Sequence, residues 1–331
     1  MKILHIGKNG NMERFTKMPD FVKEMELVDI PMNLPVEEYL DKAKDADIII
    51  ADAMAPVKAE LINAMPNLKM ICSEGVAINS FDIEAAKKRG IYVTNNAGMN
   101  ADAVAEQTLL LMVGLLKNVA VNDAKVREGL QIETKEAYMA NMNLYEMSDF
   151  SVGLIGMGNI AKSTVRLLKA YNVKEIYYYK RNKLSDEEEE KLGIVYKPLD
   201  ELLAASDFIS MHTPVTPQTL NMANDDFFNK MKDGSYFVNT ARGEVVDSRA
   251  LVRALESGKI KMAGLDTVDN EPARRDHYLL NLDEEISKRI LFAPHIGGIT
   301  VSSFRRGYEM IWENVLLLCE GKHPNRVVNN L

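Results

Sequence analysis

Short hydrophobic runs alternate with longer amphipathic stretches along the whole chain. This alternation is typical of parallel β-strands whose faces are covered by helices. In the first hundred residues it predicts buried strands at 2–6, 26–30, 47–51, 68–72 and 91–93, with helices between them at 36–44 and 58–64. The first part of the chain is therefore expected to form a compact α/β unit.

A second series of hydrophobic runs follows Asn100, which can cap a helix whose apolar residues recur at helical spacing. Strands are predicted there at 152–156, 175–180, 207–211, 236–239, 262–265 and 290–292. A long helix at 302–318 could return to the first unit. We therefore predict two doubly wound parallel-sheet α/β domains, one of residues 1–99 completed by 299–331 and a larger one of residues 100–298.

Composition and charge narrow the possible partners. With 40 Lys and Arg against 48 Asp and Glu, the net charge of −8 leaves no generalised basic face for nucleic acid. The longest apolar stretch, 109–116, is far shorter than the ~20 residues that cross a bilayer, and residues 3–6 are too few for a signal-peptide core. Two cysteines fit a reducing compartment, and five scattered histidines offer no metal-ligand spacing. We expect a cytoplasmic protein without a membrane span or a metal site.

A glycine turn between a strand and a helix indicates a dinucleotide site. Residues 151–161 read Ser-Val-Gly-Leu-Ile-Gly-Met-Gly-Asn-Ile-Ala. Gly156 permits the tight turn, Gly158 lets the backbone approach a pyrophosphate, and Ala161 permits close packing of helix on strand. Asn159 and Ile160 open the helix, whose N-terminus supplies N–H donors and positive potential. A glycine turn without any ligand is the alternative.

The end of the next strand bears on which dinucleotide binds. About 20 residues past the glycine turn an acidic residue would hold the ribose hydroxyls of NAD, whereas arginine nearby accommodates the extra phosphate of NADP. Here the strand runs into Lys180, Arg181, Asn182 and Lys183, and no acid occurs before Asp186. NADP is therefore favoured, with Lys180 and Arg181 as the residues expected to contact it, and NAD stays possible. Ordinary solvated cations after a strand are the alternative.

Polar side chains follow four further strands, at the point where each strand ends. They are His212, the Thr240 to Arg242 segment, Asp266 and His295. Because the carboxyl ends of parallel strands meet at one edge of the sheet, these residues are expected where a nicotinamide ring would lie. Each alone could be a helix cap or a solvated loop residue, but together with the glycine turn they predict a site.

These motifs, in this order, resemble the D-2-hydroxyacid dehydrogenase family. The resemblance rests on Asn-Thr-Ala-Arg-Gly at 239–243, Gly-Leu-Asp at 264–266 followed by Glu271-Pro272, and Pro-His-Ile-Gly at 294–297. Residues 75–82 and 100–106 also resemble the family's substrate-domain loop and domain-linking helix. The resemblance covers nearly the whole chain. It implies a Rossmann-type cofactor domain and a smaller flavodoxin-like substrate domain.

The resemblance also implies roles for individual residues. Arg242 would grip the carboxylate of a 2-oxo acid with its fork of donors, and His295 would be the general acid at the carbonyl oxygen. Glu271, by its charge, would hold a proton on His295. Asp266 would anchor the nicotinamide carboxamide, and Thr240 would lie at the cofactor edge. Taken singly, a surface salt bridge, a turn residue and a loop histidine are the structural alternatives for the three catalytic positions.

The substrate is expected to contact both domains. Besides Arg242 and His295, the backbone N–H groups of Val76 and Ala77 would bind its carboxylate, and Met54 would border the pocket for its side chain. For His212, a structural role and a cofactor contact stay equally open. A homodimer built on residues near 100 to 150 is implied by the same resemblance.

We therefore expect an oxidoreductase that transfers a hydride between NAD(P)H and a small 2-oxo acid to give a D-2-hydroxy acid. The missing acid after the second strand places the chain closer to the glyoxylate and hydroxypyruvate reductase branch. Two alternatives remain: a cofactor-sensing, corepressor-like binding module, and oxidation of another small anion such as formate or phosphite on the same scaffold. The substrate side chain and the physiological direction stay open.

Overall fold

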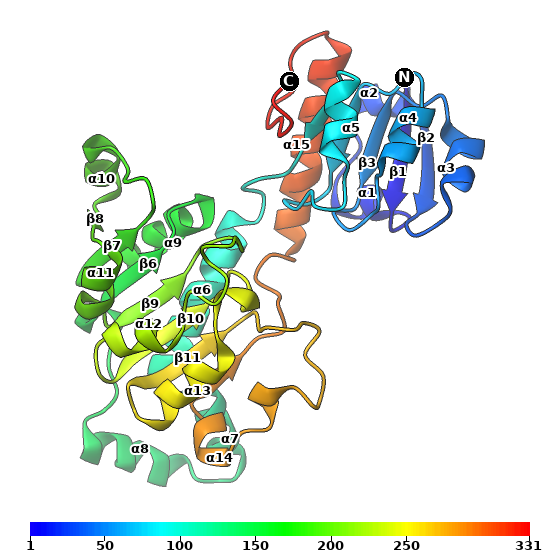
Figure 1. The fold of residues 1–331 in the computed structure, drawn as a ribbon. Helices are drawn as coiled ribbons and strands as arrows, with labels where there is room; N and C mark the ends of the chain where they lie inside the picture. Colours follow the sequence, from blue (N-terminus) through cyan, green and yellow to red (C-terminus); the bar gives the residue numbers. More distant parts are fainter. The chain divides into compact units, whose positions relative to one another are not determined.

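The computed structural model describes all residues, 1–331, and the chain divides into two compact units. Unit 1 comprises Met1–Asn100 and Ile299–Leu331, and unit 2 comprises Ala101–Gly298. The sequence-based boundary lies one residue earlier, after residue 99. Each unit is an α/β structure around a parallel sheet, so the predicted fold class is confirmed (Figure 1).

Unit 1 contains a five-stranded parallel sheet in the order β2-β1-β3-β4-β5. The strands are β1 (Lys2–Gly7), β2 (Glu26–Pro31), β3 (Ile48–Ala51), β4 (Met70–Ser73) and β5 (Tyr92–Thr94). All five were predicted from hydrophobic runs, with ends shifted by one or two residues at most. Such runs are expected because both faces of a parallel sheet are buried.

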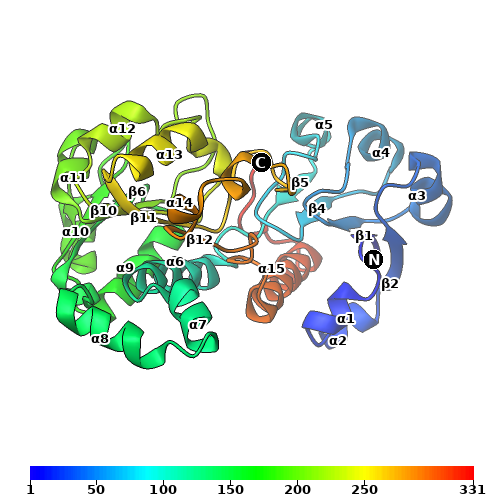
Figure 2. The same cartoon turned by 90° about the horizontal axis from the view of Figure 1, so that it is seen from below.

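Helices cover both faces of the unit 1 sheet (Figure 2). One face packs against α3 (Val36–Ala43), α4 (Ala59–Ala64) and α5 (Ile83–Lys88). The other packs against α1 (Asn11–Phe15), α2 (Asp20–Lys23) and α15 (Val301–Cys319). Because α15 buries Tyr308, Ile311, Trp312 and Val315 in this core, the predicted return of the C-terminal helix to the first unit is what the structure has.

Unit 2 contains a seven-stranded parallel sheet in the order β12-β11-β10-β9-β6-β7-β8. The strands are β6 (Ser151–Ile155), β7 (Glu175–Tyr179), β8 (Val195–Tyr196), β9 (Phe208–Met211), β10 (Ser235–Asn239), β11 (Ile260–Leu265) and β12 (Ile290–Phe292). The chain runs outward from β6 to β8 and returns to β9 on the other side of β6. Ligands of doubly wound sheets bind outside the carboxyl ends at such a reversal. Only β8 was missed, because two residues are too few for a pattern.

Two layers of helices enclose the unit 2 sheet (Figure 2). One layer is α6 (Ala101–Leu116) and α9 (Asn159–Ala170), and the other is α11 (Leu199–Ala205), α12 (Asp225–Lys230) and α13 (Ser248–Glu256). Shorter elements lie in the connections: α10 (Asp186–Leu192), α14 (Glu284–Ser287), η1 (Met147–Asp149), η2 (Gly243–Val245) and η3 (Tyr278–Leu280).

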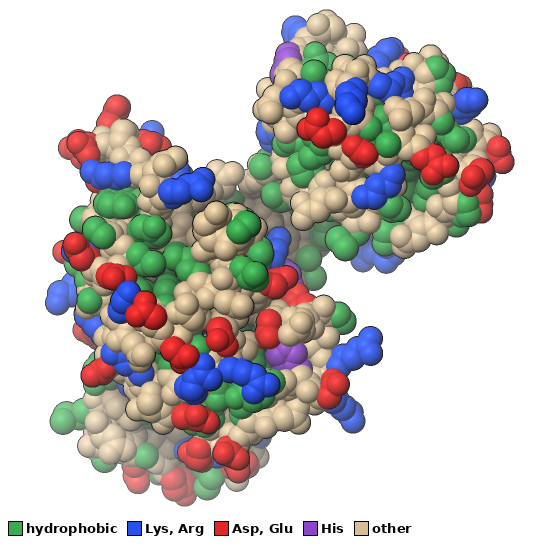
Figure 3. Space-filling view, viewed as in Figure 1, with side chains coloured by type: hydrophobic (Ala, Val, Ile, Leu, Met, Phe, Trp, Pro, Cys, Tyr) green, Lys and Arg blue, Asp and Glu red, His purple; other side chains and the backbone are tan.

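The two α-helices between α6 and β6 have no buried residue. These are α7 (Val119–Arg127) and α8 (Gln131–Asn141), which the sequence did not predict. Among the helices, none alone has the length and apolar composition to cross a bilayer; α6 and α7 pass that test only as a pair, with a bend of 58° between them. On the face shown in Figure 3, acidic and basic side chains are interspersed without a continuous basic patch.

Candidate active site

The glycine turn after β6 is built as the sequence predicts for a dinucleotide site. Gly156 has φ +104°, and a Cβ atom there would lie 2.4 Å from the carbonyl oxygen of His212. A side chain is therefore excluded both by the backbone conformation and by space. The Gly156 N–H donates to the Tyr179 carbonyl oxygen at 2.8 Å, which places the turn beside the end of β7.

The N-terminus of α9 is open and carries unpaired donors. No atom lies within 4 Å of the position that a Cβ at Gly158 would occupy. No side chain caps the helix, and its first turn contains no acidic residue. The N–H groups of Asn159, Ile160 and Ala161 donate to no protein acceptor, because the first bond of this helix runs from Lys162 N to Gly158 O. This arrangement fits a pyrophosphate.

The basic residues after β7 separate into two groups. Lys183 is bound to Asp186 at 2.8 Å and to Glu189 at 3.4 Å. Lys180 is half-buried and Arg181 is exposed, and neither makes an ion pair. Two of the predicted cations are therefore available to an anion, whereas Lys183 is neutralised within the protein.

Tyr178 holds the loop that carries these cations. Its hydroxyl accepts a hydrogen bond from Leu184 N at 3.0 Å and donates to Glu189 Oε1 at 2.5 Å. Burial of the ring, together with the hydrogen bond to Glu189, raises the pKa of Tyr178, so the hydroxyl keeps its proton and remains a donor. The loop from 180 to 184 is thus fixed at residue 184 by its hydrogen bond to the Tyr178 hydroxyl.

The structure places His212 and Thr240 at strand ends, each with a partner inside unit 2. The His212 Nε2 atom lies 3.0 Å from Ser210 Oγ, and burial lowers the pKa of His212 to about 4, so the imidazole is neutral at ordinary pH. Thr108 donates to Val104 O, so the contact of 2.8 Å between the Thr240 and Thr108 hydroxyls has Thr240 as its donor. Thr240 therefore anchors the end of β10 to α6.

His295 and Glu271 form a direct pair. His295 Nδ1 lies 2.6 Å from Glu271 Oε2, and Glu271 Oε1 accepts a hydrogen bond from Val268 N at 3.0 Å. An ionised carboxylate only accepts hydrogen bonds, so it places a proton on Nδ1 of the imidazole. The other ring nitrogen, Nε2, has no protein partner and is free to exchange a proton with a substrate.

Asp266 fixes the loop that presents His295. Its side chain is buried and accepts hydrogen bonds from Ile296 N and Gly297 N, each at 3.0 Å. A Cβ atom at Gly297 would lie 2.9 Å from Asp266 Oδ2, so glycine is needed for this approach. His295 itself has φ +55°, which is uncommon for a residue with a side chain and must be held by its surroundings. The sequence indicated only a cofactor contact for Asp266 and missed this positioning role.

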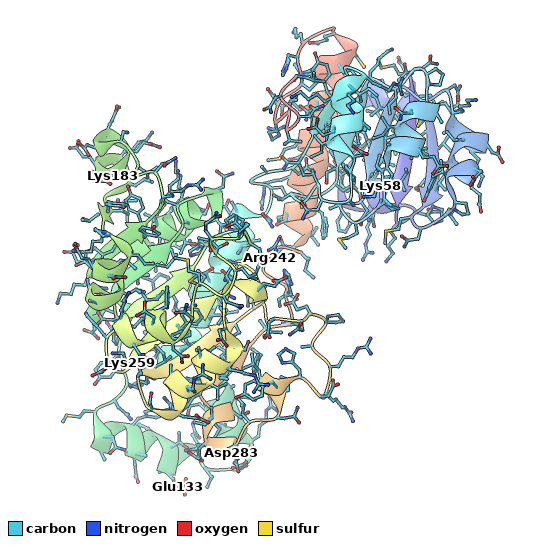
Figure 4. The ribbon with its side chains drawn as sticks, viewed as in Figure 1. Lys58, Glu133, Lys183, Arg242, Lys259 and Asp283 are labelled. Carbon is cyan, nitrogen blue, oxygen red and sulfur yellow. The ribbon has the colours of Figure 1, made fainter.

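Arg242 lies on the neighbouring loop, after β10 (Figure 4). A Cβ atom at Gly243 would lie 1.9 Å from the carbonyl carbon of Val268, so the Arg242 loop packs directly on the loop that contains Glu271. The Arg242 guanidinium is exposed, has no carboxylate partner and donates only to Ala241 O at 2.6 Å. The other donors of its guanidinium fork are therefore free for an anionic ligand.

A cavity of about 680 Å³ is lined by the loops that carry Glu271 and His295, and Arg242 is not among its lining residues. Asp266, Glu271 and His295 supply its polar groups, and Leu280 and Phe292 are among its apolar walls. His277 also lines it, but its Nε2 donates to Asp269 O at 2.8 Å and its Nδ1 accepts from Leu279 N at 3.3 Å. Both nitrogens are thus used within the protein, which is a packing role.

The three substrate-domain residues suggested by the sequence lie in unit 1. Met54 is 75 % exposed. The N–H groups of Val76 and Ala77 donate to no protein acceptor, although the loop is tied through its carbonyls: Asn95 Nδ2 donates to Val76 O and Ser73 Oγ donates to Ala77 O, each at 2.9 Å. The loop thus presents two successive free donors.

Comparison with known proteins decides the family. Residues 109–297, more than half of the chain, match the D-isomer specific 2-hydroxyacid dehydrogenase, NAD binding domain. The chain belongs to the D-isomer specific 2-hydroxyacid dehydrogenase family. This confirms the resemblance seen in the motifs. The dehydrogenase uses a nicotinamide cofactor and reduces 2-oxo acids to D-2-hydroxy acids.

Relatives over nearly the full length support the assignment. The dehydrogenase is 34% identical to glyoxylate reductase of Thermococcus litoralis over 318 residues, which cover 96% of this chain and 94% of that protein. It is 34% identical over 291 residues to glyoxylate reductase of Korarchaeum cryptofilum, covering 88% and 85%.

Solved structures show the same fold. A glyoxylate reductase from Paecilomyes thermophila is similar with a TM-score of 0.78 at 29% identity, covering 99% of this chain and 97% of that one. The apo D-mandelate dehydrogenase of Rhodotorula graminis is similar with a TM-score of 0.84 at 25% identity, covering 99% and 97%.

Proposed function

We propose that the dehydrogenase reduces a small 2-oxo acid of the glyoxylate or hydroxypyruvate type and prefers NADPH. The observation that carries this proposal is the pairing of His295 with Glu271 beside an Arg242 that has no protein carboxylate. The glyoxylate reductases among its relatives support the choice of a small 2-oxo acid.

The chain supplies binding, orientation and a proton. A bound nicotinamide supplies the hydride for the carbonyl carbon. Arg242 of unit 2 binds the substrate carboxylate with parallel N–H donors. Within unit 1, the free amides of Val76 and Ala77 are two further donors of the kind that binds a carboxylate. His295 Nε2 gives its proton to the carbonyl oxygen, while Glu271 holds the opposite side of the ring and stabilises its positive charge.

Residues of unit 2 would hold the cofactor. The free amides of Asn159 and Ile160 would donate to the pyrophosphate, and Gly156 and Gly158 would allow its close approach. Lys180 and Arg181 take the 2′-phosphate of NADP, because neither is neutralised by a protein carboxylate and no acid competes for the ribose hydroxyls directly after β7.

A substrate panel tests the proposal. Purified protein is assayed with NADPH and with NADH against glyoxylate, hydroxypyruvate and larger branched or aromatic 2-oxo acids, and with formate and phosphite in the oxidative direction. The highest kcat/KM is expected for a two- or three-carbon 2-oxo acid with NADPH. Fastest turnover of a branched or aromatic acid, or reduction of NADP by formate or phosphite, would refute it.

Changing Arg181 to Ala is expected to weaken NADPH binding about tenfold or more, since a charge-assisted hydrogen bond to phosphate is lost. NADH binding should hardly change, because NADH lacks that phosphate. Dissociation constants for both cofactors measure the difference. Lys183→Ala is the matched control, because its charge is already engaged by Asp186 and Glu189. Equal weakening of both cofactors by Arg181→Ala would show that Arg181 binds no phosphate.

We also propose that α7 and α8 are the interface of a homodimer. Neither helix buries a residue within its own chain, yet the pair and the following segment expose Val126 (53 %), Ile132 (65 %), Met139 (68 %) and Met142 (82 %). Several large apolar side chains exposed on helices that bury nothing within their own chain are typical of a surface covered by a partner. A second copy of the same chain is the partner proposed, in line with the symmetry of most oligomers.

The double variant Ile132→Glu/Met139→Glu is expected to be monomeric, because two buried charges would have no partners in the interface. Light scattering should give twice the chain mass of 37.2 kDa for the wild type and the single mass for the variant. Val195→Glu, which changes an exposed apolar residue on β8, is the control and should leave the mass doubled. A wild-type monomer at micromolar concentration would refute the interface.

A further inference from the structure

A buried charged cluster in unit 1 has no part in the proposed chemistry. His5 lies on β1 and its side chain is fully buried. Its Nδ1 lies 2.6 Å from Asp29 Oδ1, and its Nε2 lies 2.9 Å from Glu74 Oε1. Tyr308 of α15, also buried, donates its hydroxyl to the same Glu74 oxygen. We refer to His5, Asp29, Glu74 and Tyr308 as the His5 cluster.

The geometry of the cluster determines the protonation state of the His5 ring. Both ring nitrogens of His5 face carboxylate oxygens, which only accept hydrogen bonds, so both nitrogens carry protons and the ring is an imidazolium. Burial of the ring opposes this charge, but the hydrogen bonds and charges of Glu74 and Asp29 outweigh it and raise the pKa of His5. Glu74 therefore has two firm donors, one from β1 and one from α15.

The packing around Glu74 leaves little room for movement. A Cβ atom at Gly7 would lie 2.7 Å from His5 Nε2, so this strand end must be glycine for the ring to reach Glu74. A Cβ atom at Gly307 would lie 3.0 Å from Asn96 Nδ2, which itself donates to the Glu74 carbonyl oxygen at 3.1 Å. Side chain and backbone of Glu74 are thus both clamped.

Glu74 is the residue directly before the loop with the free donors. It continues β4 through a hydrogen bond from its own N–H to Ala51 O at 2.8 Å, and the chain then turns through Gly75 to Val76 and Ala77. The direction of these two N–H groups depends on the backbone that leaves Glu74. A shift of that residue would turn the donors away from any carboxylate that they bind.

We propose that the His5 cluster is a positioning device for the substrate carboxylate: His5 and Tyr308, through Glu74, hold the Val76 and Ala77 amides in a binding orientation. The inference rests on the proposed role of these amides in substrate binding. His5, Glu74 and Tyr308 touch no reacting atom and act on substrate affinity. Losing one of the two donors to Glu74 should therefore raise the KM for the 2-oxo acid and leave kcat and cofactor affinity close to wild type.

The test compares two buried tyrosines of unit 1. Tyr308→Phe removes the hydroxyl that binds Glu74. Tyr39→Phe is the matched control, because the Tyr39 hydroxyl accepts from Leu34 N at 3.1 Å and donates to Pro31 O at 3.2 Å, away from the loop. Both changes delete one buried hydroxyl and should cost similar stability. Glu74→Gln is a second variant that keeps an acceptor for Tyr308 but loses the charge that faces His5.

Three quantities are measured for each variant: KM and kcat for the 2-oxo acid that the wild type turns over best, the Kd of NADPH, and amide hydrogen exchange of the 74–82 segment. Tyr308→Phe and Glu74→Gln are expected to raise KM about three- to tenfold, the scale of one hydrogen bond, and to speed exchange in this segment. The kcat and the Kd should stay near wild type, and Tyr39→Phe should change none of these values.

Exchange of the 74–82 segment that matches wild type in both variants would overturn the positioning role. Faster exchange with unchanged KM would overturn the link to the substrate, and would show that the Val76 and Ala77 amides do not bind it. Equal changes of KM and of amide exchange in Tyr308→Phe and Tyr39→Phe would show that the His5 cluster only stabilises unit 1 and does not position the loop. Turnover of 2-oxo acids by the wild type is measured first, and it alone tests the 2-oxo acid assignment. The variants then test only the role of the His5 cluster, so the two failures can be told apart.

Discussion

Changing His295 to Ala is expected to lower kcat for 2-oxo acid reduction about 10²- to 10⁴-fold, the usual contribution of a positioned general acid. The structure gives the reason: Glu271 Oε2 occupies Nδ1 at 2.6 Å and leaves Nε2 as the ring nitrogen that is free to exchange a proton with a substrate. Water would have to replace that donor in the variant. The affinity for NADPH should be almost unchanged, because the contacts proposed for the cofactor, at the glycine turn and at the cations after β7, do not include His295.

Steady-state kinetics with the best 2-oxo acid and a fluorescence titration with NADPH measure the two effects. His323→Ala is the control, since this exposed histidine of unit 1 contacts the backbone oxygens of Pro324 and Leu331 and the ring of Tyr92, all within unit 1. Its kcat should equal that of the wild type. A His295→Ala enzyme that keeps more than about a tenth of the wild-type kcat would remove His295 from the proton transfer.

The sheets could be predicted from sequence because parallel strands are buried on both faces and therefore form continuous hydrophobic runs. The runs at 47–51 and 207–211 illustrate this, since β3 and β9 consist of fully buried residues. Helices α7 and α8 gave no such signal. Their apolar residues face outward and bury nothing within the chain, so no hydrophobic face is set apart from a polar one.

The residues of the candidate site that follow strand ends could be predicted from the sequence. The residues that only position them, through a single hydrogen bond, could not. Residues after β10, β11 and β12 were expected together, because these strands are neighbours in the sheet. No sequence pattern indicates that the Asp266 carboxylate accepts hydrogen bonds from the N–H groups of residues 296 and 297. Nor does any pattern indicate that the Glu74 carboxylate accepts hydrogen bonds from His5 and Tyr308. Backbone donors carry no sequence signature, and these partners are distant along the chain.

The basic run after β7 shows the same limit. From the sequence, Lys180 and Arg181 are the cations assigned to the cofactor, and Lys183 follows them in the same run. Only the structure shows that Lys183 is paired with Asp186 and Glu189, whereas neither Lys180 nor Arg181 makes an ion pair. The sequence carries no sign of this difference, because it depends on where the side chains of Asp186 and Glu189 point.

Changing Arg242 to Lys is expected to lower kcat/KM for the 2-oxo acid about 10- to 100-fold, which is the scale of one charged hydrogen bond. Lysine keeps the positive charge but offers a point donor in place of the planar fork that matches a carboxylate. The loss should fall mainly on KM, with some on kcat, because a carboxylate held by one contact leaves the carbonyl less well aligned with His295.

Arg249→Lys is the matched control for this substitution. Arg249 is exposed, lies on α13 and stacks over the Tyr278 ring at 4.7 Å, so the same chemical change there leaves the proposed carboxylate site intact. Parallel kinetics on both variants separate the loss of a specific contact from a general effect of replacing arginine. Near wild-type kcat/KM in Arg242→Lys would mean that charge alone suffices at this position and that the guanidinium does not grip the substrate with two bonds. A loss of the same size in Arg249→Lys would instead show that the effect comes from a disturbed chain segment from β10 to α13, which carries both arginines.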